Sequence, residues 1–207
     1  MKIFKKGDYS KFLLVLFLII WILLAINPRY RIAWAYENIL TIVFVFLLIL
    51  TYKRFKFSNF TYSLLFILLV LHAIGGHFSY TEVPLFDLIK DNFNLERNNY
   101  DRFVHFIFGF IFYFPAYEFI SKKVGIRGFW LYFIIFLIVT GLKGIYEVIE
   151  YLSLLTTKSE IIGTNFLGMQ GDQWDAQKDM ILGMIGAFFA WIVILIRERF
   201  KILKVLY

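Results

Sequence analysis

Residues 39–50 of the chain read ILTIVFVFLLIL, a run in which one hydroxyl is the only polar side-chain group. Similar runs recur along the 207 residues, of which 60% are hydrophobic, whereas soluble domains contain about 45–50% apolar residues. About 20 such residues in a helix are enough to cross the hydrocarbon core of a bilayer. The sequence therefore predicts an all-α polytopic membrane protein.

We expect six transmembrane helices in one bundle, forming a single transmembrane domain over residues 1–207. The first apolar run follows a basic N-terminal tail, as in a signal peptide, but it stays bulky up to Asn27 and Pro28 and lacks a small-residue cleavage site. We therefore interpret it as a span. The expected spans cover about residues 12–27, 34–52, 60–76, 101–120, 128–151 and 175–196.

The basic residues predict the orientation of these spans. With six spans, both termini lie on one side, together with the loops around residues 53–56 and 122–127. These segments contain 14 of the 22 Lys and Arg residues but only three of the 15 Asp and Glu residues. Because cytoplasmic loops are enriched in basic residues, we predict an N-in/C-in protein of a bacterial or archaeal cell (inner) membrane.

This distribution of charge also limits the kinds of binding partner that the sequence predicts. The net charge of +7 is divided among short clusters between apolar runs, which indicates topology signals and membrane lipid rather than nucleic acid. The chain has no cysteine, which excludes disulfides, zinc–thiolate sites and thiol nucleophiles. The sequence does not predict an oligomeric state.

Ionisable residues gather at the outer ends of the predicted spans. Asp101 and His105 are four residues apart, as are Asp175 and Asp179, so each pair lies on one face of its helix. Ionisable groups inside membrane segments are costly and mark functional sites. The same region also contains Lys143, Glu147, Glu150, Asp172, His72 and His77.

Each of these residues also has a structural interpretation. Asp101, Asp172 and Asp175 can cap helix N-termini, and Lys143 with Glu147 can form an ion pair within one helix. Several carboxylates together are harder to explain in this way, because two of them about 4 Å apart repel by roughly 4 kcal/mol at an effective dielectric constant near 20. Such a group must be protonated, paired with basic residues or neutralised by a cation.

We therefore predict a divalent-cation site with His105 and Glu150 as the catalytic acid–base residues. Carboxylate ligands favour Mg²⁺, Ca²⁺ or Mn²⁺, and a contribution from His105 or His77 shifts the preference toward Mn²⁺ or Zn²⁺. The predicted metal ligands are Asp101, Glu147, Asp172, Asp175 and Asp179.

At these residues the chain resembles the YjdF-like family of bacterial inner-membrane proteins, whose function is unknown. The resemblance covers nearly the whole chain and implies a membrane protein and a site, but no reaction. Gln173 and Trp174 join the candidate site through it. The matching segments are residues 75–84 (GGHFSYTEVP), 97–102 (RNNYDR) with His105, Tyr146-Glu147 with Glu150, and 170–175 (QGDQWD) with Gln177 and Asp179.

More distantly, the second half is similar to the VanZ-like family. That family has glutamine near the position of Glu150 and asparagine in place of Gly183. The residues that fit its pattern are Asp101-Arg102, His105-Phe106, Glu147, Asp179 and Gly186.

Three functions are compatible with these observations. The first is a membrane-embedded enzyme that acts on a lipid or cell-envelope headgroup, which a helix N-terminus near Asp175 would favour by attracting an anion. The second is a transporter of a cation or small solute, although the sequence shows no inverted repeat. The third is an accessory membrane protein in which the polar cluster, including Lys143, only joins helices.

Overall fold

The regular structure of the described residues is helical throughout. A computed structural model describes residues 8–156 and 170–206. Five segments are long and apolar enough to cross a membrane, namely α2, α3, α5 with η1, α6 and α8, and α1 is a shorter apolar helix. The elements are α1 (Asp8–Leu24), α2 (Arg31–Thr51), α3 (Asn59–Phe78), α4 (Pro84–Asn92), α5 (Tyr100–Phe119), the π-helical turn η1 (Ile120–Val124), α6 (Gly128–Thr156) and α8 (Asp175–Leu206).

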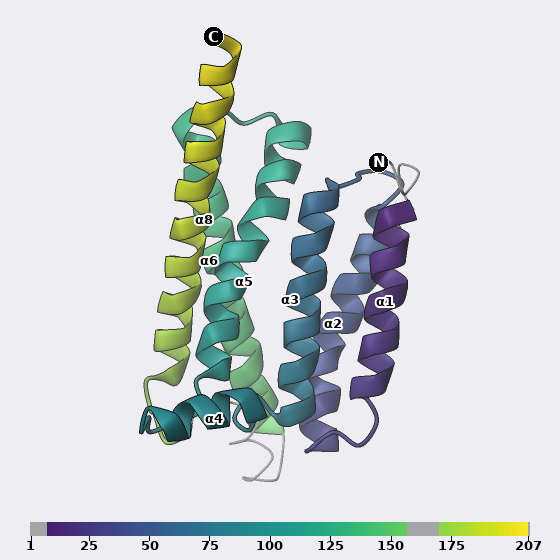
Figure 1. Cartoon of the computed structure of the whole chain (residues 1–207), viewed down its shortest axis with the longest axis vertical. Helices are drawn as coiled ribbons and strands as arrows, with labels where there is room; N and C mark the ends of the chain where they lie inside the picture. Colours follow the sequence, from purple (N-terminus) through teal and green to yellow (C-terminus); the bar gives the residue numbers. More distant parts are fainter. Residues whose placement is uncertain (1–7, 157–169, 207) are drawn as a thin grey trace.

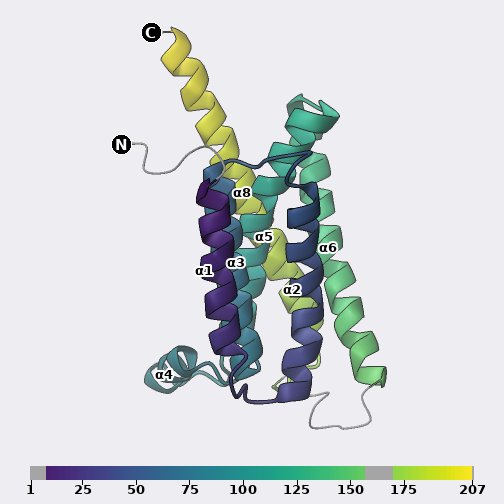
Figure 2. The ribbon, with the colours of Figure 1, turned by 90° about the vertical axis from the view of Figure 1, so that its right-hand side faces the viewer.

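The long helices form two groups that lie side by side (Figure 1). In the first group α3 packs against α1 and α2, and in the second α5, α6 and α8 pack against one another. The groups meet where α3 contacts α5. The start of α1 and the end of α8 lie at the same end of the bundle in both views (Figures 1 and 2).

Large apolar side chains cover the outside of the helices, and several polar side chains point inward. On α2, for example, Ile39 and Phe46 are exposed, whereas Glu37, Asn38 and Thr41 are buried. Hydrocarbon cannot hydrogen-bond to polar groups, so a membrane environment favours this arrangement. The surface pattern agrees with the apolar composition of the spans.

α5 and α8 approach each other most closely, and both run in the same direction (Figure 1). A Cβ atom on Gly109 of α5 would overlap the backbone of Gly183 of α8, and one on Gly186 would overlap the carbonyl oxygen of Phe106. Small residues of this kind allow helix backbones to approach closely in a membrane. These glycines therefore fix the position of α8 along α5.

The two halves of the bundle differ in chemistry. We call the half that contains the first turns of α5 and α8 the site half, because the predicted site residues lie there. The other half, the opposite half, has an apolar core in which Tyr113, Ile135, Val139 and Ala190 are buried. At its end Glu118 accepts hydrogen bonds from Ser58, Thr61 and Lys122.

The segment between the third and fourth expected spans, residues 77–100, contains a helix of its own. This helix, α4, lies across the site end of the bundle rather than along it (Figure 1). Pro84 occupies its first turn, where the missing N–H group of proline has no helical partner to lose.

Candidate functional site

The close contact of α5 and α8 aligns two ladders of polar residues. Because Gly109 lies against Gly183 and the helices are parallel, the residues one turn earlier, His105 and Asp179, face each other at one level. One further turn brings Asp101 and Asp175 to the end of the bundle. Residues that are four apart on each helix thus face their counterparts on the other helix.

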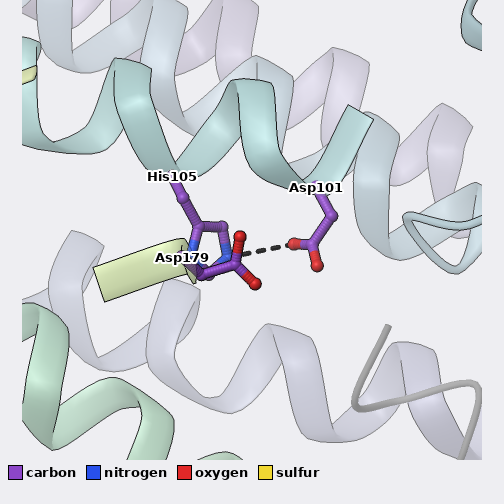
Figure 3. A group of neighbouring side chains, drawn as sticks. All are labelled: Asp101, His105 and Asp179. Atoms are coloured by element: carbon purple, nitrogen blue, oxygen red, sulfur yellow. Dashed lines mark ion pairs between the residues drawn. The ribbon is translucent and has the colours of Figure 1, made fainter. Parts of the chain in front are cut away.

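The innermost part of the site consists of Asp101, His105 and Asp179 (Figure 3). Nε2 of His105 lies 2.9 Å from Oδ1 of Asp101, and one potential ligand atom from each residue lies within 4.8 Å of the other two. All three residues are buried, with Asp179 only 2% exposed. We call these three residues the Asp–His–Asp cluster.

Two atoms of this cluster lack a hydrogen-bond partner among the described residues: Nδ1 of His105 and Oδ1 of Asp179. A buried polar group without a partner costs about 1–3 kcal/mol, and more if it is charged. Native proteins rarely leave such groups unpaired, so these two atoms are the positions in the cluster at which a proton, a water molecule, an ion or a ligand atom would complete the hydrogen bonding.

A lysine and a glutamate of α6 lie beside the cluster. Nζ of Lys143 is 3.3 Å from Nε2 of His105 and forms an ion pair with Glu147. Oε1 of Glu147 is in turn 3.5 Å from Nδ1 of His105. Gly183 leaves room for the lysine stem, because a Cβ atom there would be 3.0 Å from Cγ of Lys143. The predicted pair of Lys143 and Glu147 is therefore present and contacts the imidazole from both sides.

Basic side chains lie between the cluster and the end of the bundle. Arg97 forms an ion pair with the buried Asp175, and Arg102 approaches Asp172 to 2.5 Å and Asp175 to 3.5 Å. Lys178 also donates to Asp172, at 2.5 Å, and this hydrogen bond lowers the pKa of Asp172 to about 2. The structure thus places Asp172 and Asp175 among basic partners rather than in the Asp–His–Asp cluster.

The remaining predicted residues lie at the periphery or in the wall of the site. Glu150 is buried on α6, one turn beyond Glu147, whereas Gln173 and Trp174 are exposed. Nδ1 of His77 lies 2.7 Å from the carbonyl oxygen of Leu24 and so satisfies the end of α1.

Comparisons with known proteins place the chain in a family. The model of the family described as "Predicted membrane protein (DUF2238)" matches residues 9–199, which include every site residue discussed above. The chain belongs to this family. It is also 31% identical over 170 residues to "Inner membrane protein YjdF" of Escherichia coli (strain K12), an alignment that covers 82% of this chain and 80% of the relative. No solved structure matches it.

These matches confirm the expected resemblance to YjdF-like proteins and give no support to the VanZ-like one. With the helical fold, they make this member of the family a multi-pass membrane protein of uncharacterised function. The family description names no ligand or reaction.

Sequence reasoning missed one acidic residue of this family member, Glu37. It is buried on α2, and its carboxylate accepts a hydrogen bond of 3.1 Å from the hydroxyl of Tyr146 on α6. The ring of Tyr146 lies edge-on to His105, with ring centroids 6.0 Å apart, and under Nζ of Lys143 at 4.6 Å. Glu37 therefore links α2 to the site through Tyr146. A charged residue inside an apolar run was the available signal.

A second group found only in the structure surrounds His72. Nε2 of His72 lies 3.1 Å from the carbonyl oxygen of Glu37, and Nδ1 is bonded to the hydroxyl of Tyr80. Burial raises the pKa of Tyr80, so its hydroxyl stays protonated and donates a hydrogen bond to the imidazole of His72. The ring of Tyr80 packs on Gly75, where a Cβ atom would meet the ring at 2.5 Å.

Proposed function

We propose that α1 also crosses the membrane, which gives six spans, both termini in the cytoplasm and the site half at the outer face. The common end of α1 and α8 and the basic residues near that end support this topology. The name of the Escherichia coli relative supports an inner-membrane location for this chain. In this orientation the Asp–His–Asp cluster lies in the outer half of the membrane.

We infer that the Asp–His–Asp cluster binds a divalent cation. The observation that carries this proposal is Oδ1 of Asp179, which has no hydrogen-bond partner among the described residues in a side chain that is only 2% exposed. An ion bound between Asp101, His105 and Asp179 would satisfy Oδ1 of Asp179. Two carboxylates and one imidazole are a ligand set that suits Mn²⁺ or Zn²⁺ better than Ca²⁺.

We further propose that the bound cation helps to bind an anionic lipid or cell-envelope headgroup. Arg102 and Lys178 are 24% and 48% exposed at the mouth of the site, so they can meet a ligand that enters from the outer leaflet. A guanidinium group beside a divalent cation is a combination that suits phosphate and carboxylate groups. Because His105 would be a ligand of the cation, Glu147 and Glu150 are the candidate general bases for a reaction of the headgroup.

Transport is less well supported than headgroup binding. A transported ion needs polar groups along its path, yet the opposite half has the apolar core around Ile135 and Val139. That half also contains a cavity of about 490 Å³ whose lining includes Phe44, Phe112 and Ile138 and offers no polar surface.

One observation favours a second candidate function, proton transfer without a metal. The Lys143 ammonium group lies 3.3 Å from His105, where it repels a cation and can balance the charge of Glu147. In that case Nδ1 of His105 is the site of proton exchange, with Glu147 as its partner at 3.5 Å.

Cation binding and metal-free proton transfer can be separated by measuring Mn²⁺ binding to the purified, chelator-treated protein. Electron paramagnetic resonance reports the free Mn²⁺. For cation binding we expect about one ion per chain, at least a tenfold loss of affinity in Asp179→Asn, and about 2.7 kcal/mol of stabilisation at a hundred times Kd. The matched control is Asp91→Asn, because Asp91 is an exposed carboxylate of α4. If Asp179→Asn binds Mn²⁺ as the wild type does, the cluster is not the metal site.

The headgroup proposal needs its own measurement. We expect the protein to retain phosphatidylglycerol in preference to phosphatidylcholine, and Arg102→Gln to lose that preference while keeping its affinity for Mn²⁺. Equal retention of both lipids by the wild type would contradict the headgroup proposal and leave cation binding intact.

A further inference from the structure

The helix α4 has a position that differs from that of every other helix of the described chain. It lies across the site end of the bundle in Figure 1, and Figure 2 shows it beside the bundle rather than beneath it. None of its residues is fully buried. A short helix with this placement runs roughly along the plane of the membrane surface, because the spans define the membrane normal.

The sequence of α4 separates apolar from charged residues. Leu85, Leu88 and Ile89 are spaced i, i+3 and i+4, so they share one face of the helix. The charged residues Asp87, Lys90 and Asp91 follow the same spacing two residues later and occupy the other face. This division is the pattern of an amphipathic helix that lies in a membrane interface.

The apolar face of α4 is largely uncovered. Leu85 is 63% exposed and Leu88 is 62% exposed, and Phe93 just after the helix is 73% exposed. Burying a large apolar side chain contributes about 1.5–3 kcal/mol relative to leaving it in water. Three neighbouring apolar side chains left in water at the membrane surface would therefore be unfavourable.

The bundle fixes one edge of this face. Phe86 lies between Tyr100 and Phe103 of α5, with ring centroids 5.1 and 5.5 Å away. Phe103 is itself 37% exposed on the outer surface of its span. The apolar face of α4 is therefore continuous with an apolar surface that faces lipid.

We propose that α4 is an interfacial helix that inserts its apolar face into the bilayer leaflet on the side of the site. The occupant of this face is the lipid surface, because the face continues the lipid-facing surface of α5 at the level where the spans end. Asp87, Lys90 and Asp91 then face the water and the headgroups. The depth expected for such a helix is about 5–10 Å below the headgroup boundary.

This anchor is connected to the candidate site by a short path of hydrogen bonds. Nδ2 of Asn98 donates to Oδ1 of Asp87 at 2.9 Å and to the carbonyl oxygen of Val83 at 3.0 Å. The backbone of Asn98 exchanges two hydrogen bonds of 2.9 Å with the side chain of Gln170. The next residue toward α4 is Arg97, which pairs with Asp175. These contacts join α4 to the basic residues beside the site.

The chain lacks cysteine, so single labelled cysteines can report the depth of α4 directly. The test uses the full chain in vesicles of phosphatidylethanolamine and phosphatidylglycerol, with an environment-sensitive fluorophore on the cysteine of Leu88→Cys. A lipid with a nitroxide high on its acyl chain serves as one quencher and aqueous iodide as the other. Asp91→Cys, on the charged face of the same helix, is the matched control.

We expect the lipid nitroxide to quench the label at position 88 at least about twofold more strongly than the label at position 91, and iodide to show the reverse order. Leu85→Cys repeats the measurement at a second exposed position. Equal access of iodide to positions 88 and 91 would overturn the proposal. So would protection of position 88 from both quenchers together with cross-linking between chains, because a second copy would then cover the face.

Discussion

Two carboxylates, one in each half of the bundle, have opposite hydrogen-bonding environments. In the opposite half the Glu118 carboxylate accepts hydrogen bonds from Ser58, Thr61 and Lys122, so its charge is well compensated. In the site half the Asp179 carboxylate is more deeply buried, and its Oδ1 has no hydrogen-bond partner among the described residues. The first arrangement stabilises a fold, whereas the second costs stability and is expected where a ligand completes the site.

The largest effect is expected at the close contact between α5 and α8. Gly109→Ala places a Cβ atom in the backbone of Gly183, so α5 and α8 must separate, and we expect a loss of about 3 kcal/mol in the free energy of unfolding together with loss of Mn²⁺ binding. The matched control is Gly141→Ala, also within a span, where a Cβ atom meets nothing within 4 Å. There we expect a gain of about 0.5–1 kcal/mol.

Both variants can be measured by titrating the purified protein with a denaturing detergent and following helix content. If Gly109→Ala and Gly141→Ala have the same stability, the close glycine contact does not align the polar ladders.

A pair of charge-removing variants tests the comparison of the halves directly. Glu118→Gln replaces an acceptor of several hydrogen bonds by an amide with the wrong donors, so we expect a loss of about 2 kcal/mol. Asp179→Asn removes an unpaired buried carboxylate, so we expect a gain of up to about 1 kcal/mol in metal-free protein. The two variants should therefore change the unfolding free energy in opposite directions.

The measurement is thermal unfolding of each variant with chelator and then with Mn²⁺ added. If Asp179→Asn is less stable than the wild type in the presence of chelator, then the Asp179 carboxylate stabilises the fold without a metal. That result would support the structural interpretation of the site half.

Two tyrosine hydroxyls provide a smaller and more selective comparison. Tyr146 donates to Glu37 in the site half, and Tyr113 donates to the carbonyl oxygen of Tyr132, at 2.8 Å, in the opposite half. Tyr146→Phe and Tyr113→Phe each remove one hydrogen bond and should each cost about 1 kcal/mol. Only Tyr146→Phe should also weaken Mn²⁺ binding, by about tenfold, because the lost hydrogen bond to Glu37 holds in place the ring that packs against His105.

Titration of both variants with Mn²⁺ checks this prediction. Equal Mn²⁺ affinities for Tyr146→Phe, Tyr113→Phe and the wild type would mean that Glu37 and Tyr146 only join α2 to α6.

Much of the site half could be predicted because its residues are spaced along single helices. The four-residue spacing of Asp101 with His105 and of Asp175 with Asp179 follows from helix geometry alone. How far one helix is shifted along its neighbour depends on a tertiary contact. Here the contact of Gly109 with Gly183 sets that shift. Sequence spacing therefore could not separate Asp179, in the cluster, from Asp175, which pairs with Arg97.

The elements missed by the sequence analysis are those whose role depends on a neighbour. Glu37 is a single charge in an apolar run, and its importance depends on the facing hydroxyl of Tyr146. The helix α4 has nine residues, too few for a span, so a search for membrane-spanning runs does not find it. Its signal was local, with Pro84 at the start and apolar residues at helical spacing.

The smallest effect is expected at the edge of the site half, where Asp172 meets solvent. Lys178 lowers the pKa of Asp172 to about 2 from an ordinary value of 3.8. Because the folded-state value is the lower one, ionised Asp172 contributes its stability in full above about pH 4, and the contribution is lost as the pH falls toward 2. The difference in Tm between the wild type and Asp172→Asn should follow this course, whereas Asp91→Asn should show a smaller difference. Added salt should reduce the effect, since Lys178 is 48% exposed. A Tm difference that is independent of pH would mean that Asp172 stabilises the protein through the shape of its loop and not through its charge.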